Sequence, residues 1–325
     1  MRTKLIKNLS LLVMAMGFSC VAMAQEEPQF SQYMFNRMSY NPGYAGSTGS
    51  ICVTLMYRNQ WMGFGLDPTP NGKTGTTPKD ILFTFDAPIK FLHGGIGLSF
   101  TSDKIGFHDN TVLAADYAFK MNWGNGSLSA GLEFELLSSK LDKNGLWAPE
   151  DDPLVSNLGE SATLIDGGVG AYYQVPGKYY LGFSVKNLLA AHSDVIYFQN
   201  ARTLYIMGGY EYTPATSPSL RIKPSALIKT ADLSTFQADL TCMFDYRNAF
   251  WGGLGYRVQD AIYVMAGVRW KKMRLGVSYD FTTSKIGAYK PGRSDGSVEV
   301  FLKFCPKIVT PRKPTTAHGN TIWLD

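Results

Sequence analysis

Few residues of this 325-residue chain have the types and spacing that catalysis or metal binding needs. A nucleophile elbow requires the pattern G-x-S-x-G, which does not occur. The stretch Gly72–Thr74 ends like a phosphate-binding loop, but the glycine required five residues earlier is Asp67. The histidines are scattered without metal-ligand spacing: His93, His108, His192 and His318. We therefore expect a protein that is not an enzyme and has no cofactor.

A run of carboxylates, Glu150-Asp151-Asp152, could offer oxygen ligands to a calcium ion. The D-x-[DN]-x-[DN]-G spacing of a calcium loop is missing, which favours a solvated loop. The net charge of +5 is mild, and no basic patch interleaved with aromatic residues indicates nucleic acid.

The N-terminus has the layout of a secretory signal. Arg2, Lys4 and Lys7 precede an apolar run, and Ala22-Met23-Ala24 supplies the small residues of a signal-peptidase site. Cleavage between Ala24 and Gln25 is expected, and the run is short for a membrane anchor. A lipoprotein signal at Cys20 is the alternative, but the residues before it lack the aliphatic start of a lipobox.

The elements that position any functional residue are predicted to be β-strands. Aromatic residues make up 13% of the chain, charged residues 18%, and glycine occurs 33 times. Apolar and polar residues alternate with period 2 over about 14 segments of about 9 to 12 residues, the length a tilted strand needs to cross a membrane. The predicted strands lie near 51–58, 81–86, 95–101, 113–120, 128–136, 163–174, 181–186, 203–213, 220–229, 236–245, 249–258, 262–270, 274–282 and 298–304.

This pattern predicts an all-β fold, a transmembrane antiparallel β-barrel, because strands of soluble sandwiches are shorter. A soluble exported sandwich is the alternative. Long links at 62–79, 140–161, 189–200 and 284–295 follow odd-numbered strands, and short links follow even-numbered ones. Such phasing places both ends of the barrel chain in the periplasm. Two expected outer links, near Ala231 and Val258, are short exceptions.

Side chains on the polar face of the strands are predicted to line the lumen, either as a pore lining or as a satisfied network that plugs it. The charged ones are Arg58, Asp86, Asp116, Lys120, Glu133, Glu135, Lys186, Asp239, Arg269, Arg274 and Asp280. Aromatic residues at strand ends are expected in interfacial girdles: Trp61, Trp123, Tyr179, Tyr180, Tyr210, Tyr212, Trp251 and Trp270. Cys52, Cys242 and Cys305 remain after cleavage, and any one pair of them could form a disulfide.

The segment QFSQYMFNRMSYNPGYAG, Gln29 to Gly46, resembles the N-terminal signature of the PorP/SprF family of outer-membrane proteins. The matching residues are Gln29–Asn36, Asn41-Pro42 and Tyr44–Gly46. From them we single out a candidate partner-binding or barrel-mouth motif: Gln29, Phe30, Ser31, Gln32, Tyr33, Phe35, Asn36, Asn41, Pro42, Tyr44 and Gly46. Further similar stretches are Tyr57-Arg58, Gln60-Trp61, Gly182–Leu188, Lys223–Ser225 and Gly276–Asp280. Gly43 departs from the alanine that is commoner in the family.

The resemblance implies an outer-membrane component of the Bacteroidetes type IX secretion and gliding machinery. Its partners would be periplasmic ring subunits, a peptidoglycan-associated lipoprotein, or C-terminal signal domains of secreted adhesins. The expected organisation is a signal peptide at 1–24, a periplasmic segment at 25–49, a barrel in outer-membrane lipid at 50–304 and a periplasmic tail at 305–325. A porin-like or solute-transporting barrel is the alternative. For Gln29–Gly46 we expect a segment at the periplasmic mouth that plugs it, presents side chains to a partner, or staples the barrel.

Overall fold

The computed structural model describes residues 28–63, 77–106, 108–141, 161–194, 196, 198–284 and 294–306. The predicted signal peptide with its Ala24–Gln25 cleavage site, the Gly72–Thr74 loop and the Glu150–Asp152 carboxylates lie outside these residues, as does the tail after residue 306. In the described ranges no helix is long and apolar enough to cross a membrane.

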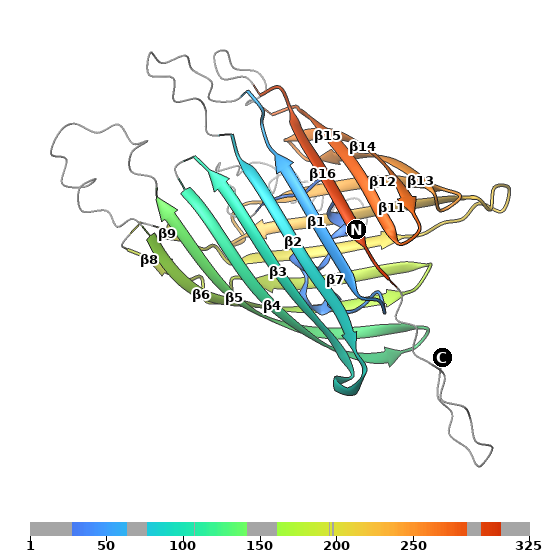
Figure 1. Cartoon of the computed structure of the whole chain (residues 1–325), viewed down its shortest axis with the longest axis horizontal. Helices are drawn as coiled ribbons and strands as arrows, with labels where there is room; N and C mark the ends of the chain where they lie inside the picture. Colours follow the sequence, from blue (N-terminus) through green and yellow to red (C-terminus); the bar gives the residue numbers. More distant parts are fainter. Residues whose placement is uncertain are drawn as a thin grey trace, which may run out of the picture.

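Fourteen antiparallel strands close into a barrel, which confirms the predicted fold (Figure 1). In chain order they are β1 (Cys52–Asn59), β2 (Lys79–Ile89), β3 (Gly94–Ile105), β4 (His108–Trp123), β5 (Gly126–Leu141), β6 (Ser161–Val175), β7 (Tyr179–Lys186), β10 (Thr203–Tyr210), β11 (Leu220–Ala231), β12 (Gln237–Tyr246), β13 (Phe250–Arg257), β14 (Ala261–Trp270), β15 (Met273–Thr282) and β16 (Ser297–Phe304). Each strand pairs with its sequence neighbours in the barrel.

The barrel closes where its first strand meets its last. Strand β1 pairs with β16 from Val53 opposite Phe304 to Asn59 opposite Val298. The last strand ends at Phe304, as the sequence predicts. Closure leaves no unpaired strand edge, which is the condition for a sheet to exist in lipid.

The two ends of the barrel differ in their links. We call the end where β1 begins and β16 ends the inner end, and the opposite end the outer end. Inner links are short, for example residues 124–125 and 271–272, whereas the links 60–78, 142–160 and 283–296 lie at the outer end. The link between β3 and β4, 106–107, is a third short outer link that the sequence reading did not recognise. In outer-membrane barrels the short turns face the periplasm.

Some strands are longer than expected, and one link carries structure. Strands β4 and β5 each have 16 residues and β6 has 15, so this side of the wall extends further at the outer end (Figure 1). The link between β7 and β10 contains a two-stranded hairpin of β8 (His192–Ser193) and β9 (Phe198–Gln199), which the alternation pattern did not predict because each strand has two residues.

The alternating pattern divides every strand into a lumen face and a lipid face. In β5, Leu132 and Phe134 are 62% and 56% exposed on the outer surface, while the intervening Glu133 and Glu135 are buried inside. Successive side chains of a strand point to opposite faces, so the alternation of apolar and polar residues determines the chemistry of both the exterior and the lumen. The apolar exterior is therefore the surface that lipid covers.

Five of the eight aromatic residues expected in girdles are exposed on the exterior at the inner ends of their strands or just beyond, as a girdle requires: Trp123, Tyr179, Tyr210, Tyr212 and Trp270. Trp61 is half-buried just beyond the outer end of β1. The expectation is wrong for two residues. Tyr180 and Trp251 are buried and face the lumen. Their positions alternate with outward-facing neighbours, and each packs on the N-terminal segment described below.

Candidate functional site

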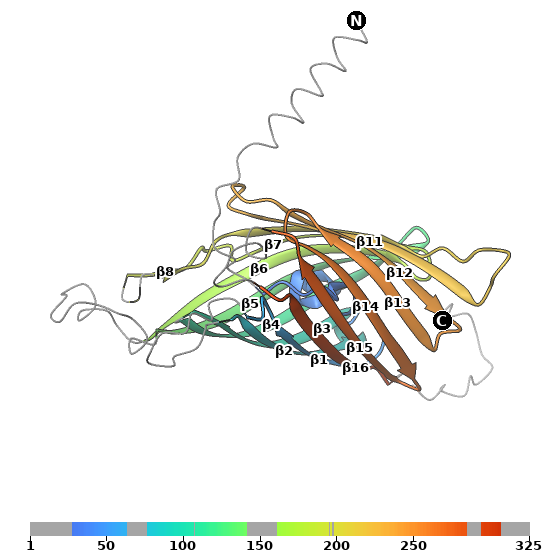
Figure 2. The same ribbon diagram turned by 90° about the horizontal axis from the view of Figure 1, so that it is seen from above.

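The segment before β1 lies inside the barrel, where Figures 1 and 2 show it in blue between the walls. It forms three short 3₁₀ turns: η1 (Tyr33–Phe35), η2 (Met38–Tyr40) and η3 (Pro42–Tyr44). The candidate motif is buried throughout. Its members with less than a tenth of their surface exposed include Gln29, Phe30, Ser31, Gln32, Tyr33, Phe35, Asn36, Asn41 and Tyr44, and Pro42 and Gly46 are likewise buried. We call residues 28–50 the lumen segment.

A cluster of charged side chains from five strands surrounds Ser31. The Ser31 hydroxyl donates to Asp280 Oδ2 at 2.6 Å. It accepts from Arg58 Nη1 at 3.0 Å and from Arg257 Nη2 at 3.1 Å. We define the Ser31 cluster as Ser31 and Gln29 with Arg58, Asp239, Arg257, Asp280 and Glu299.

The main chain of the lumen segment completes the Ser31 cluster. The Ser31 and Gln32 amides donate to the two carboxylate oxygens of Glu299 at 2.7 and 3.0 Å. Gln29 Nε2 donates to Asp239 Oδ2 at 2.7 Å, whose other oxygen accepts from Arg257 Nε at 2.9 Å. Arg58 also pairs with Asp280 at 2.9 Å.

Every charged group of the Ser31 cluster is at most 1% exposed. Removing charges from water costs several kcal/mol per ion unless partners and hydrogen bonds replace the lost hydration. Two cations face three carboxylates here, and the amides of the lumen segment supply the remaining donors. The barrel wall and the lumen segment therefore supply most of each other's hydrogen-bond partners, while Arg58 Nε and Asp280 Oδ1 have none among the described residues.

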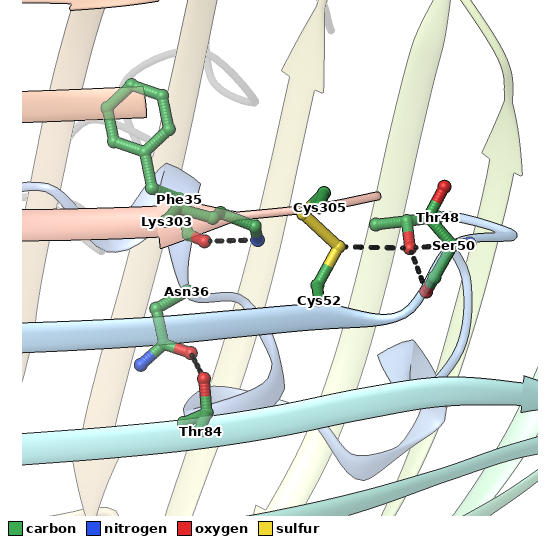
Figure 3. Close-up of a disulfide and its surroundings, with 8 residues drawn as sticks. All are labelled: Phe35, Asn36, Thr48, Ser50, Cys52, Thr84, Lys303 and Cys305. Atoms are coloured by element: carbon green, nitrogen blue, oxygen red, sulfur yellow. Dashed lines mark hydrogen bonds between the residues drawn. A yellow bond between two sulfur atoms is a disulfide. The ribbon is translucent and has the colours of Figure 1, made fainter. Parts of the chain in front are cut away.

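Phe35 fixes the segment on the same side of the barrel. Its ring stacks on Phe301 at 4.5 Å between centroids and lies 4.7 Å from the Trp251 ring. Its carbonyl accepts a 2.7 Å hydrogen bond from Lys303 Nζ, which Figure 3 shows. The next residue, Asn36, accepts from the Thr84 hydroxyl on β2 at 3.3 Å (Figure 3).

Tyrosines of the lumen segment reach other strands. Tyr33 shares a 3.0 Å hydroxyl hydrogen bond with Ser225 on β11, and the Tyr40 ring lies edge-on to Tyr205 on β10. Burial raises the pKa of the hydroxyls of Tyr33, Tyr40 and Tyr44 above its ordinary value. These side chains therefore act as neutral hydrogen-bonding and packing groups.

The Asn41–Gly43 turn rests on the opposite wall. Asn41 Nδ2 donates to the carbonyls of Ala171 on β6 and Phe183 on β7, at 3.0 and 3.2 Å. Asn41 Oδ1 accepts from the Gly43 amide at 2.8 Å, and so caps η3. Proline at the first position of this turn suits the local geometry.

Glycines in the wall make room for this turn. A Cβ added at Gly131 on β5 would lie 2.3 Å from the Gly43 nitrogen, and one added at Gly170 on β6 would lie 2.3 Å from Asn41 Oδ1. Real Cβ atoms do not approach backbone atoms this closely. Glycine in these strands therefore permits close approach of a second backbone.

The lumen segment thus contacts opposite walls. Its first part binds β1, β12, β13, β15 and β16, and its second part binds β5, β6 and β7. The chain then returns to the inner end, where Gly46, at φ +66°, leads to the start of β1. A segment held on both sides occupies the cross-section between them.

A disulfide joins the ends of the barrel chain at the inner end. Cys52, the first residue of β1, is bonded to Cys305, which directly follows β16, with 4.2 Å between their Cα atoms (Figure 3). Cys242 is free. This resolves the pairing that the sequence left open, and it places a covalent link across the seam between β1 and β16.

The predicted lumen charges all face inward, and many are paired. On the far wall Lys186 lies 3.5 Å from Glu133 and 3.9 Å from Glu135, and its ammonium also donates to the Ser39 carbonyl. In the described part of the chain, no group of three His, Cys, Asp or Glu residues could hold a metal ion.

Two comparisons identify relatives of this architecture. The sequence profile of the type IX secretion system membrane protein PorP/SprF matches residues 22–304. The chain belongs to the PorP/SprF family. It is an outer-membrane β-barrel of the type IX secretion system. No curated protein is matched by the sequence.

Solved structures share the barrel architecture with this PorP/SprF protein. The TodX deltaS2S3 mutant, a monoaromatic hydrocarbon channel, has a TM-score of 0.50 and 9% identity, over 83% of this chain and 94% of that chain. Omp33 of Acinetobacter baumannii has a TM-score of 0.45 and 7% identity, over 79% of this chain and 97% of that chain. At such identities the likeness to TodX shows the fold alone.

The stretches that carry the PorP/SprF resemblance meet in three dimensions. Arg58 and Asp280 bind Ser31, and Ser278 accepts from Gln32 at 3.4 Å. Ser225 bonds to Tyr33, while the Ser184 hydroxyl donates to the Tyr40 carbonyl. The scattered stretches are therefore the wall side of the contacts that the lumen segment makes.

Sequence reasoning missed two members of the Ser31 cluster, Arg257 and Glu299. Arg257 ends a weakly patterned strand, and Glu299 is one polar position in a strand where polar and apolar residues share a face. An arginine at the end of a glycine-rich strand carries no recognisable spacing signal. The signal that could have found both is their inward phase, which matches that of Asp239 and Asp280 on neighbouring strands.

Proposed function

We propose that this PorP/SprF protein is a non-enzymatic platform of the type IX secretion and gliding apparatus. It would dock periplasmic ring subunits or a peptidoglycan-associated lipoprotein, anchor secreted adhesins, or do both. The observation that carries the proposal is the lumen segment, which binds opposite walls of the barrel through buried hydrogen bonds.

Buried charge supports a permanent rather than a transient plug. Withdrawal of the lumen segment would leave Arg58, Arg257 and three carboxylates without Ser31 and without the amides that bind Glu299. Leaving buried charges without their partners costs about 3–5 kcal/mol for a single broken pair. A barrel braced in this way offers its two ends, rather than its lumen, as functional surfaces.

The signature residues fit the role of an internal brace. Presentation of Tyr33, Phe35, Asn36 or Tyr44 to a partner would require them to leave positions in which each is at most 7% exposed. We therefore propose that partners bind the rim and turns that the brace holds in place, and that the signature acts on them indirectly.

Affinity capture of the full chain from the native envelope tests the docking role. A tag in an outer link keeps the inner end free, and untagged envelope is the control. We expect recovery of ring subunits, a peptidoglycan-binding lipoprotein or an adhesin with a C-terminal signal domain. A correctly folded, tagged barrel that recovers none of these would overturn the proposal. The porin-like alternative predicts ion conductance by the pure protein.

A further inference from the structure

The links at the two ends of the barrel carry opposite charge in the described residues. The inner links carry five exposed cations and one acid; the cations are Lys90, Lys178, Arg247, Lys271 and Lys272, and the acid is Glu211. The described parts of the outer links carry four acids and one cation, namely Asp194, Asp232, Asp260, Asp295 and Arg202. The inner end therefore favours partners with negative charge.

Cations also line the lumen wall at the inner mouth. They are Lys120, Arg221, Lys223, Arg269, Arg274 and Lys303. Three carboxylates neutralise part of this charge: Glu211 lies 2.8 Å from Lys223, Asp245 lies 3.0 Å from Arg221 and 3.6 Å from Arg269, and Asp86 attracts Lys120 and Lys303. The remaining excess of positive charge lies on the side of the mouth where β15 and β16 meet the lumen segment.

A cavity of about 150 Å³ opens at this mouth between the lumen segment and the wall. Arg37 and Arg274 both line it, together with Phe35, Tyr180 and Lys223. The Arg37 guanidinium lies 3.7 Å from the centroid of the Tyr180 ring and donates to the Tyr172 hydroxyl at 3.0 Å. The Arg274 guanidinium lies 5.0 Å from the centroid of the Phe35 ring.

These two arginines differ from Arg58 and Arg257 in their partners. Among the described residues neither has a carboxylate within ion-pair distance, unlike Arg58 and Arg257. Arg37 Nε is buried without a hydrogen-bond partner, and so is the hydroxyl of Tyr180, a residue that is only 9% exposed. Stacking on aromatic rings holds both guanidinium groups in place while donors stay unused.

We infer that the cavity between Arg37 and Arg274 binds a side-chain carboxylate from an acidic segment of a periplasmic protein. This inference rests on the proposed docking function and adds the chemistry of the contact. Guanidinium groups bind carboxylates through paired N–H donors, and the unused Arg37 Nε and Tyr180 hydroxyl supply two more donors. The basic inner links extend the attraction around the mouth and steer the acidic segment toward it.

A protein segment fits this position better than a lipid headgroup. Phe35, Arg37, Tyr180 and Arg274, which line the cavity, face the lumen, whereas lipid covers the opposite face of the strands; Tyr179 and Tyr210 of the exterior girdle and the β6–β7 link complete the lining at the rim. A headgroup tethered by its acyl chains lies in the bilayer plane outside the rim. A protein chain that approaches along the barrel axis reaches the cavity directly.

Binding of a labelled oligo-glutamate peptide to the pure full chain in nanodiscs tests the inference. We expect binding that weakens as salt is added, because charges in contact with solvent are screened. An oligo-glutamine peptide of the same length should not bind. Arg274→Gln should weaken binding of oligo-glutamate about tenfold or more, as expected for loss of a hydrogen bond to a charged group. Lys104→Gln removes one exposed cation at the outer end and should leave binding unchanged.

Several outcomes would overturn the inference. They are equal affinity for the two peptides, binding that is insensitive to salt, or equal losses in the Arg274 and Lys104 variants. Stronger binding of phosphatidylglycerol vesicles or inorganic phosphate than of oligo-glutamate would assign the cavity to phosphate instead. Heat-modifiable gel mobility checks that the Arg274 variant is folded, and salt dependence of the unaltered chain tests the inference if it is not.

Envelope capture separates this inference from the function on which it rests. If the unaltered chain recovers ring or lipoprotein subunits and Arg274→Gln recovers them equally at every salt concentration, the carboxylate site is wrong and the docking role stands. If the folded, unaltered chain recovers none of them, the docking role itself fails.

Discussion

Ser31 and Asp280 are joined by a 2.6 Å hydrogen bond inside the barrel, although 249 positions separate them in the sequence. The same serine hydroxyl receives donors from two arginines on other strands. One small side chain of the signature thus connects β1, β13 and β15. This contact explains why a segment that precedes the barrel can stabilise its closed form.

Replacement of Ser31 by alanine tests this contact. Ser31→Ala removes the acceptor of Arg58 Nη1 and Arg257 Nη2 and the donor to Asp280, all of them buried. Leaving such groups unsatisfied costs about 1–3 kcal/mol, so the unfolding midpoint should fall. Denaturant titration followed by heat-modifiable gel mobility measures it. Ser219→Ala, an exposed serine in an inner link, is the matched control and should have no effect. Equal midpoints for the two variants would contradict the role of Ser31.

Replacement of Gly131 by alanine tests the close approach of the Asn41–Gly43 turn to the wall. The added Cβ would lie 2.3 Å from two backbone atoms of the lumen segment, so the turn must move. Overpacking of this kind costs about 1–3 kcal/mol, and limited proteolysis should cut the lumen segment faster. Gly252→Ala on β13 is the control, because its Cβ would meet nothing closer than 3.4 Å. Unchanged protection in Gly131→Ala would mean that the turn does not rest there.

Removal of the disulfide tests the covalent seam. The double variant Cys52→Ala/Cys305→Ala should lose about 2–4 kcal/mol, since the bond restricts the unfolded chain. Thermal unfolding with and without reductant measures the change. Reductant should lower the midpoint of the unaltered chain and leave that of the double variant in place. Cys242→Ala removes the free cysteine and should respond to reductant like the unaltered chain. A midpoint of the unaltered chain that does not respond would contradict a seam disulfide.

Deletion of Gln29–Asn41 tests whether the lumen segment is the plug. The deletion leaves inward charges such as Arg58 and Glu299 facing a space that water can enter. If the barrel still assembles, it should conduct ions in planar bilayers, and its stability should fall. An assembled deletion variant that is closed to ions and as stable as the full chain would refute the plugging role.

The sequence predicted the barrel wall well because its signal is local. Period-2 alternation found all fourteen barrel strands, and it placed charged residues such as Glu133 and Lys186 in the lumen. Residue type misplaced Tyr180 and Trp251 on the exterior, because an aromatic residue at a strand end can face either the lipid or the lumen. Phase within the strand, rather than residue type, decides which surface it joins.

The contents of the lumen could not be predicted from the sequence, because the contacts are distant in the chain. Ser31 meets residues more than 200 positions away, and its neighbours carry no periodic pattern. Spacing along the chain does not favour any one pair among Cys52, Cys242 and Cys305, and the bond between Cys52 and Cys305 follows from the pairing of β1 with β16 in the closed barrel. The positions of residues in the closed barrel show which of them are in contact, and their spacing along the chain does not.

The conductance of the unaltered pure protein in planar bilayers tests the central claim most directly, that the signature segment closes the lumen. Hydrogen bonds from Ser31 to β15 and from Asn41 to β6 and β7 hold the segment across the barrel. We predict no steady ion-sized openings from protein shown to be folded and inserted. Reproducible openings of uniform size, present without denaturant and unaffected by deletion of the segment, would contradict the account.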